Sequence, residues 1–191
     1  MTVDADDADD AQKKPLPKHL RPVTSIGPIV SSAHLAEGGS PALSEVEYGL
    51  ILASHAFERW MVRCMSAAGL PGLSSMEVLI LHSIRHRDRE KKLADICLIL
   101  DIEDTHVATY ALRKLEAAGL LTTGRAAKEK TVKITEKGAE ACNRYAQIRE
   151  HLLVDSTANS RPAEETLSEI AAVLRFMSGA FNQAARAATT L

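Results

Sequence analysis

The segment from Leu93 to Gly138 limits the possible fold more than any other part of the chain. Apolar residues at helical spacing predict a short helix over 93–100 and a second helix that opens at 101–104 and ends at Gly119, a residue type that often terminates helices. Two β-prone pieces follow at 120–123 and 131–135, separated by seven residues that predict a hairpin loop. A further helix is predicted to begin at Ser74 or Ser75. The order of three helices and a hairpin indicates a winged helix-turn-helix.

The second helix of this pair has one apolar side and one polar side. Spacings of one, three and four residues turn Ala108, Ala111, Leu112 and Leu115 inward. The opposite side carries residue types that hydrogen-bond base edges or phosphates, as a helix in the major groove of DNA requires. The predicted contacts on this recognition helix are Thr105, His106, Thr109, Tyr110, Arg113 and Lys114.

The predicted hairpin loop is rich in long cations. Arg125, Lys128 and Lys130 lie at its tip, where they suit the minor groove or the neighbouring phosphates. The whole chain has a formal net charge of -2, but residues 85–137 hold twelve Lys and Arg against nine Asp and Glu. The first fifty residues hold four basic against eight acidic ones. Because the basic residues gather where the helix-turn-helix is predicted, double-stranded DNA is the expected partner.

Two long helices flank this lobe, and each carries an apolar seam. The first is predicted to start after Pro41, with Ser44 as its cap and Glu47 completing a capping box. Its seam comprises Val46, Leu50, Ala53, Phe57, Trp60, Cys64 and Ala67. The last helix, 164–188, has a seam of Leu167, Ile170, Leu174, Met177, Phe181 and Ala184. Such seams form either ordinary core or a dimer interface. We interpret them as a homodimer interface, because terminal helices beyond a compact lobe have little core of their own to cover.

The predicted fold is therefore mainly α, with a two-stranded β-wing and long dimerisation helices at both ends. Residues 1–43 form an arm that is acidic and then rich in Pro, Gly and Ser, and that is expected to be partly disordered. The N-terminal dimerisation helix covers 44–72, the winged-helix lobe 73–137 and the C-terminal dimerisation helices 138–191. The acidic start does not resemble a secretory signal and no apolar run is long enough to span a membrane, so a cytoplasmic, nucleoid-associated location is expected.

No catalytic or cofactor motif is present in the sequence. It has no Gly-rich phosphate loop, nucleophile motif or metal-ligand cluster, so we expect no enzyme activity, no cofactor and no metal. His82 and His86 have the i, i+4 spacing of some metal ligands, but no third ligand is identifiable, and a surface or half-buried pair is the preferred interpretation. Cys64, Cys97 and Cys142 lie among apolar residues and are expected to be buried thiols. Oxidant sensing by Cys64 is the alternative.

The same segment resembles the MarR family of bacterial regulators. Two family motifs are matched, the Leu-Glu-x-x-Gly-Leu ending of the recognition helix and the Ile-Thr-x-x-Gly junction after the wing. The matching residues are Leu115, Glu116, Gly119, Leu120 and Leu121, then Ile134, Thr135 and Gly138. The resemblance covers 43–191 and departs from the family pattern at Tyr110 and at 126–128. It implies a dimeric DNA-binding transcriptional regulator. It also implies a pocket for a small, often phenolic or aromatic effector, lined here by Phe57, Trp60 and Met61.

A second function class stays open at this point. Winged helices also act as protein–protein interaction modules that make no direct DNA contact. The basic wing and the polar recognition helix favour DNA over this alternative.

Overall fold

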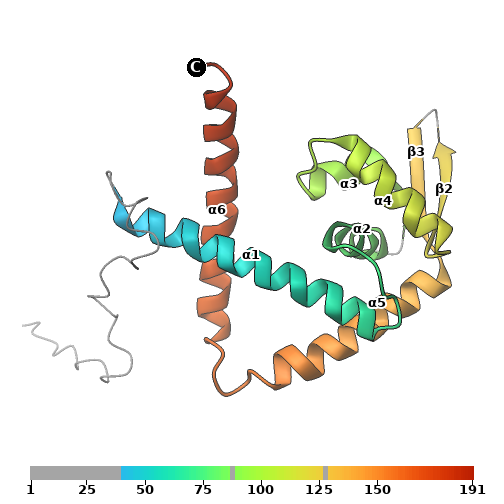
Figure 1. Cartoon of the computed structure of the whole chain (residues 1–191), viewed down its shortest axis with the longest axis horizontal. Helices are drawn as coiled ribbons and strands as arrows, with labels where there is room; N and C mark the ends of the chain where they lie inside the picture. The colour runs from blue at the N-terminus through green and yellow to red at the C-terminus, as the bar shows by residue number, and fades with distance from the viewer. Residues whose placement is uncertain (1–39, 87–88, 127–128) are drawn as a thin grey trace, which may run out of the picture. The chain divides into compact units, whose positions relative to one another are not determined.

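The computed structural model describes residues 40–86, 89–126 and 129–191 (Figure 1). The predicted arm lies outside the described residues as far as position 39. The chain divides into two compact units, residues 1–56 and 57–191, with the boundary inside the first helix. No helix in the described part of the chain is long and apolar enough to cross a membrane.

The first helix, α1, runs over Pro41–Ala67. The prediction that Ser44 caps this helix is wrong, because Ser44 is buried inside the first turn. The carbonyl of Ser40 accepts hydrogen bonds from the amides of Leu43 at 3.1 Å and Ser44 at 3.4 Å. Pro41 therefore occupies the first helical position, where its fixed φ fits the helix and its missing N–H is not needed.

The other helices fall close to their predicted ranges. Ser74 caps α2 (Ser75–Arg85) in a complete capping box: Ser74 Oγ accepts from the Glu77 amide at 3.3 Å, and Glu77 Oε2 accepts from the Ser74 amide at 2.8 Å. The remaining helical segments are α3 (Leu93–Ile99), α4 (Thr105–Ala117), α5 (Glu136–Arg149), a π-helical turn (Glu150–Asp155) that continues α5, and α6 (Glu164–Ala188).

The sheet has one strand more than the sequence predicted. Strands β2 (Leu121–Ala126) and β3 (Glu129–Ile134) form the antiparallel wing, and β1 (Lys91–Lys92) pairs with the outer side of β3, in the order β1-β3-β2. The sequence did not reveal β1 because two lysines carry no alternation of apolar and polar residues. The predicted seven-residue loop is also wrong, since pairing continues through Arg125 opposite Lys130 and leaves only 127–128 between the strands.

A buried lysine joins β1 to the end of α2. Lys91 is only 6% exposed, and its Nζ donates hydrogen bonds to the carbonyls of Ser83 at 2.5 Å, Ile84 at 2.9 Å and His86. These carbonyls belong to the last turn of α2, where the helix leaves acceptors without intrahelical donors and its dipole favours a cation. The contact fixes the start of the sheet against α2.

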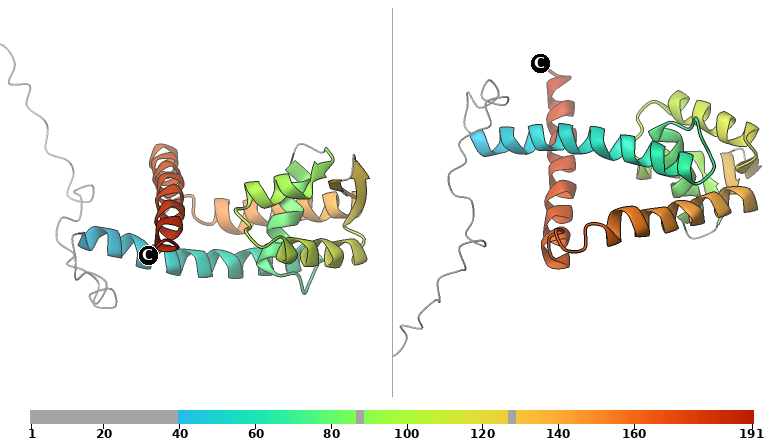
Figure 2. Two further views of the ribbon diagram at one scale, coloured as in Figure 1. Left: turned by 90° about the horizontal axis from the view of Figure 1, so that it is seen from above. Right: turned by 60° about the horizontal axis from the view of Figure 1, so that its bottom comes forward.

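One apolar core lies within residues 57–191. It is built from the end of α1, from α2, α3, α4 and α5, and from the inner side of the wing. The four α4 residues predicted to face inward are all buried, as are Ile96 and Cys97 of α3. Figures 1 and 2 show β2 and β3 as a ribbon at the edge of this unit beside α4, with α5 starting at the base of the ribbon. The core therefore holds α4 and the wing at neighbouring positions.

Two apolar helix faces have no cover in the single chain. No residue of α6 is buried, and Ile170, Val173, Leu174 and Phe176 are exposed. In the other unit, the first half of α1 exposes Leu43, Val46, Leu50, Ile51 and Leu52. The α1 seam thus splits, because Trp60, Cys64 and their neighbours enter the core while its earlier residues stay exposed.

Candidate nucleic-acid interface

The N-terminal half of α4 presents its polar side to solvent. Asp104 caps the helix, with its Oδ1 accepting from the His106 amide at 2.8 Å. Asp101, in the turn before it, has the left-handed φ of 54°, which ends α3 and redirects the chain. Thr105, His106, Tyr110 and Arg113 are exposed, Tyr110 to 69%, and Thr109 is half-buried. Five of the six predicted recognition-helix residues therefore lie on one accessible or partly accessible side.

Lys114 is the exception among those six. Its Nζ lies 2.9 Å from Glu77 Oε2 and 2.8 Å from the carbonyl oxygen of Gly72, so the ammonium group is engaged inside the protein. Sequence spacing placed Lys114 at the rim of the polar side but gave no sign of partners about forty positions earlier in the chain.

The wing and α4 border a common hollow. Its volume is about 290 Å³, and Thr105 and Thr109 of α4 face Glu129 and Lys130 of the wing across it. Lys92 of β1 lies at the same hollow and forms an ion pair with Glu129 at 2.5 Å. Sequence reasoning left Lys92 out of the predicted site residues because it stands on the strand that the sequence pattern did not show.

The cations of the wing lie on paired strands. Arg125 on β2 is directly opposite Lys130 on β3, and both line a second hollow of about 410 Å³ together with Thr123 and Gly124. Arg125 is exposed and Lys130 is half-buried. Lys128, the third predicted wing residue, lies outside the described residues. The wing therefore offers two cations at a fixed spacing next to the polar side of α4.

Hydrogen bonds tie the wing to the end of α4. Glu116 Oε1 accepts from the amide of Thr123 at 2.9 Å and from its hydroxyl at 2.7 Å, and these bonds lower the pKa of the Glu116 carboxyl. Gly119 has the positive φ of 71° that ends the helix. Thr135 caps α5 and donates from Oγ1 to the Gly119 carbonyl at 2.8 Å. The two motifs recognised in the sequence thus form the junction between α4, the wing and α5.

The residues predicted to line an effector pocket divide between core and surface. Met61 is 3% exposed and belongs to the core, and Trp60 packs against that core. Phe57 is 53% exposed. The alternative that these residues serve as core holds for Met61 and Trp60.

All three cysteines are buried free thiols, as the sequence predicted. Burial raises the pKa of Cys64 and Cys97, and raises the pKa of Cys142 to about 11. Cys64 Sγ donates to the Tyr145 carbonyl at 3.6 Å. A thiol with a raised pKa is a weak nucleophile near neutral pH.

Comparison with known proteins agrees with this architecture. Residues 73–138 match a family model described as a winged helix DNA-binding domain. AbfR of Staphylococcus epidermidis superimposes with a TM-score of 0.60 at 13% identity, over 74% of this chain and 92% of AbfR. A MarR transcriptional regulator from Methanosarcina mazei Go1 gives 0.58 at 14% identity, over 77% and 96% of the two chains. A cysteine-to-serine mutant of MarR from E. coli, complexed with operator DNA, gives 0.57 at 17% identity, over 69% and 92%.

No curated protein sequence matches the chain. At such low identities the solved structures define the fold alone. The chain has the winged helix-turn-helix fold of MarR-type regulators, which confirms the fold class and the resemblance predicted from the sequence.

Proposed function

We propose that the chain binds duplex DNA with sequence preference, as a dimeric transcriptional regulator. The observation that carries the proposal is the exposed polar side of α4 beside a wing that holds Arg125 and Lys130 at the shared edge. A helix with this surface fits the major groove, and cations on a neighbouring ribbon fit phosphates or the minor groove. The matched family model carries DNA binding in its description, and MarR of E. coli and AbfR have both been solved with DNA.

The roles within the site follow from the chemistry of each side chain. Thr105, His106, Thr109, Tyr110 and Arg113 are the proposed major-groove residues. Arg125, Lys130 and Lys128 are the proposed phosphate or minor-groove contacts. Lys92 joins them, because its ammonium group borders the same hollow and Glu129 is a partner that a phosphate would replace.

Dimerisation is part of the same proposal. Exposed apolar side chains such as Ile170 and Leu174 on α6, and Val46 and Leu50 on α1, are unusual in a chain that works alone. A second copy of the chain that covers such faces also supplies a second recognition helix, so that two half-sites of a near-palindrome are bound together.

A small aromatic effector is the least supported part of the proposal. It rests on the exposed ring of Phe57, since Met61 and Trp60 contribute to the core. The proposed role is regulatory rather than enzymatic, and the proposed location is the cytoplasm, in association with the chromosome.

Selection from a random duplex library tests the function and yields a probe. Wild-type protein should enrich one near-palindromic sequence, and fluorescence anisotropy across a salt series then compares this selected duplex with a scrambled one. Arg125→Ala with Lys130→Ala should weaken binding to both duplexes and lower the slope of log affinity against log salt by roughly one unit for each phosphate in a half-site that no longer has its cation. Arg113→Ala should cost about 1–3 kcal/mol on the selected duplex and much less on the scrambled one.

A matched control and the contrary result complete this test. Arg63→Ala removes an exposed cation of α1 and should leave both affinities unchanged. If no sequence is enriched and the wing variant binds both duplexes as wild type does at every salt concentration, DNA is not the partner. The protein–protein interaction module then becomes the favoured function.

A further inference from the structure

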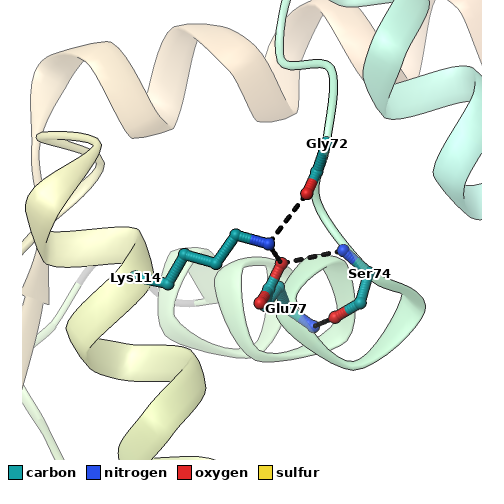
Figure 3. A network of polar contacts seen from close by, with 4 residues as sticks. All are labelled: Gly72, Ser74, Glu77 and Lys114. Carbon is teal, nitrogen blue, oxygen red and sulfur yellow. Dashed lines mark hydrogen bonds and ion pairs between the residues drawn. The ribbon is translucent and has the colours of Figure 1, made fainter.

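Lys114 connects the recognition helix to the turn between α1 and α2. It stands in the last turn of α4, and its Nζ contacts Glu77 Oε2 at 2.9 Å and the Gly72 carbonyl at 2.8 Å (Figure 3). Gly72 belongs to the turn that follows α1, and Glu77 to the first turn of α2. Neither partner lies on α4 or on the wing, so the interaction reaches from the proposed DNA-binding helix to the opposite part of the lobe.

Glu77 is held in place before Lys114 reaches it. Its side chain is 5% exposed, whereas that of Lys114 is 43% exposed. The carboxylate oxygen that pairs with Lys114 also accepts from the Ser74 amide at 2.8 Å, as half of the capping box of α2 (Figure 3). A buried carboxylate is stable only when paired and hydrogen-bonded. Moving Lys114 to a DNA phosphate would therefore leave Glu77 without its cation, and this makes Lys114 a poor phosphate ligand.

The turn itself is anchored at a second point. Arg144 of α5 donates from Nε to the Ala68 carbonyl at 2.8 Å, while Lys114 binds the Gly72 carbonyl four residues later. Gly69 and Gly72 both have positive φ, 95° and 84°, so the turn has a defined conformation. The turn is thus a fixed support, and Lys114 is the side chain through which α4 rests on it.

We propose that Lys114 is a positioning residue that sets the rotation of the recognition helix, through Glu77 and Gly72, and does not contact DNA. The inference rests on the proposed function, because it assumes that α4 enters the major groove. Base contacts need side chains at defined angles, whereas phosphate contacts tolerate small displacements. Removing the ion pair of Lys114 therefore reduces discrimination between sequences more than it reduces affinity for DNA in general.

Two substitutions of opposite charge effect separate positioning from direct contact. Lys114→Met removes a positive charge and Glu77→Gln removes a negative one, so a purely electrostatic effect on DNA would have opposite signs in the two variants. Positioning gives them the same sign. Each should lower the ratio of affinities for the selected and scrambled duplexes by about tenfold, with an unchanged salt slope, and the double variant should be no worse than the singles. Lys114→Arg keeps the cation and should retain the wild-type ratio.

Lys130→Met on the wing is the matched control, since the same chemical change at a proposed phosphate contact should lower the salt slope and leave the ratio nearly unchanged. The inference is overturned if Lys114→Met lowers the slope and both affinities while Glu77→Gln does not lower the ratio. It is also overturned if the folded variants lose only melting temperature and keep the wild-type ratio. Should Lys114→Met fail to fold, the decision passes to Glu77→Gln, whose amide oxygen still accepts from Ser74 and Lys114. A wild-type protein that selects no duplex refutes the proposed function itself, whereas normal selection with an unchanged ratio in every variant refutes only the role of Lys114.

Discussion

Gly138 illustrates how a single residue fixes the junction between the wing and α5. A Cβ at this position would overlap the Leu120 carbonyl oxygen and lie 2.9 Å from Ile134 Cγ1. The amide of Gly138 donates to Thr135 Oγ1 at 3.1 Å, while that hydroxyl donates to the Gly119 carbonyl. The absence of a side chain at 138 therefore lets α5 approach the end of α4 closely.

Gly138→Ala should accordingly destabilise the protein. The backbone of Leu120 cannot move without disturbing the strand that begins at the next residue, so the extra methyl group produces overpacking that costs about 1–3 kcal/mol in the free energy of unfolding. Urea denaturation followed by circular dichroism measures this cost. Gly179→Ala in α6 is the control, because no atom lies within 4 Å of the added Cβ, and it should be neutral or stabilising. Equal stability of Gly138→Ala and wild type would show that the close approach is not required.

Residue-level prediction from sequence succeeded where local spacing decides the outcome. The inward side of α4 follows from helical periodicity, and all four residues named for it are buried. The same periodicity placed Lys114 on the polar rim but did not identify Glu77, 37 positions earlier, as its partner. Periodicity determines the direction of a side chain, and partners distant in sequence depend on how the elements pack.

Elements were predicted well when they carry a repeating pattern and poorly when pairing alone defines them. α6 was predicted at the range that it occupies, because its apolar spacing is regular over the whole helix. β1 is two residues long and exists because Lys91 and Lys92 pair with Val132 and Thr131. The length of the wing was underestimated for the same reason, since polar residues such as Arg125 and Lys130 extend an exposed ribbon through backbone hydrogen bonds.

The packing of α2 against α5 predicts a pH dependence of stability. The ring of His82 on α2 meets that of Tyr145 on α5 edge to face, with ring centroids 4.5 Å apart. Burial lowers the pKa of His82 below its ordinary value of 6.5, and its Nε2 has no hydrogen-bond partner among the described residues. As the pH falls below about 6.5, the unfolded chain binds a proton at His82 that the folded chain resists, so the free energy of unfolding decreases.

This decrease should continue until the pH falls below the pKa of His82 in the folded state. Its slope for one proton cannot exceed about 1.4 kcal/mol per pH unit. Urea denaturation of wild type and of His82→Phe between pH 5 and 8 isolates the contribution, because phenylalanine keeps an aromatic ring against Tyr145 and does not titrate. Parallel stability profiles for the two proteins would contradict the assignment to His82.

At the scale of the whole molecule, the order of elements was predictable and their partners were not. The sequence of long helix, three helices, wing and two further helices follows from periodicity, glycines and prolines. The seam of α1 was predicted as one continuous surface, yet its later residues, Trp60 and Cys64, pack in the core of the unit that starts at residue 57. A single sequence pattern does not distinguish an intramolecular core from an intermolecular face, because both bury the same residue types.

The apolar face of α6 leads to the prediction that the protein is a dimer. Sedimentation equilibrium at micromolar concentration should give twice the chain mass of 20.7 kDa. Ile170→Glu with Leu174→Glu places two charges on the exposed seam and should give a monomer, because burying unpaired carboxylates in an interface is strongly unfavourable. Ala172→Glu is the control, since it adds a charge to the same helix on the side away from that seam, and it should remain dimeric. The monomeric variant should also lose most of its affinity for the selected near-palindrome while a single half-site is bound as weakly as by wild type, because the two recognition helices are no longer linked. A wild-type chain that sediments as a folded monomer would remove the two-fold site from the proposed mechanism and leave the exposed apolar face of α6 to a different partner.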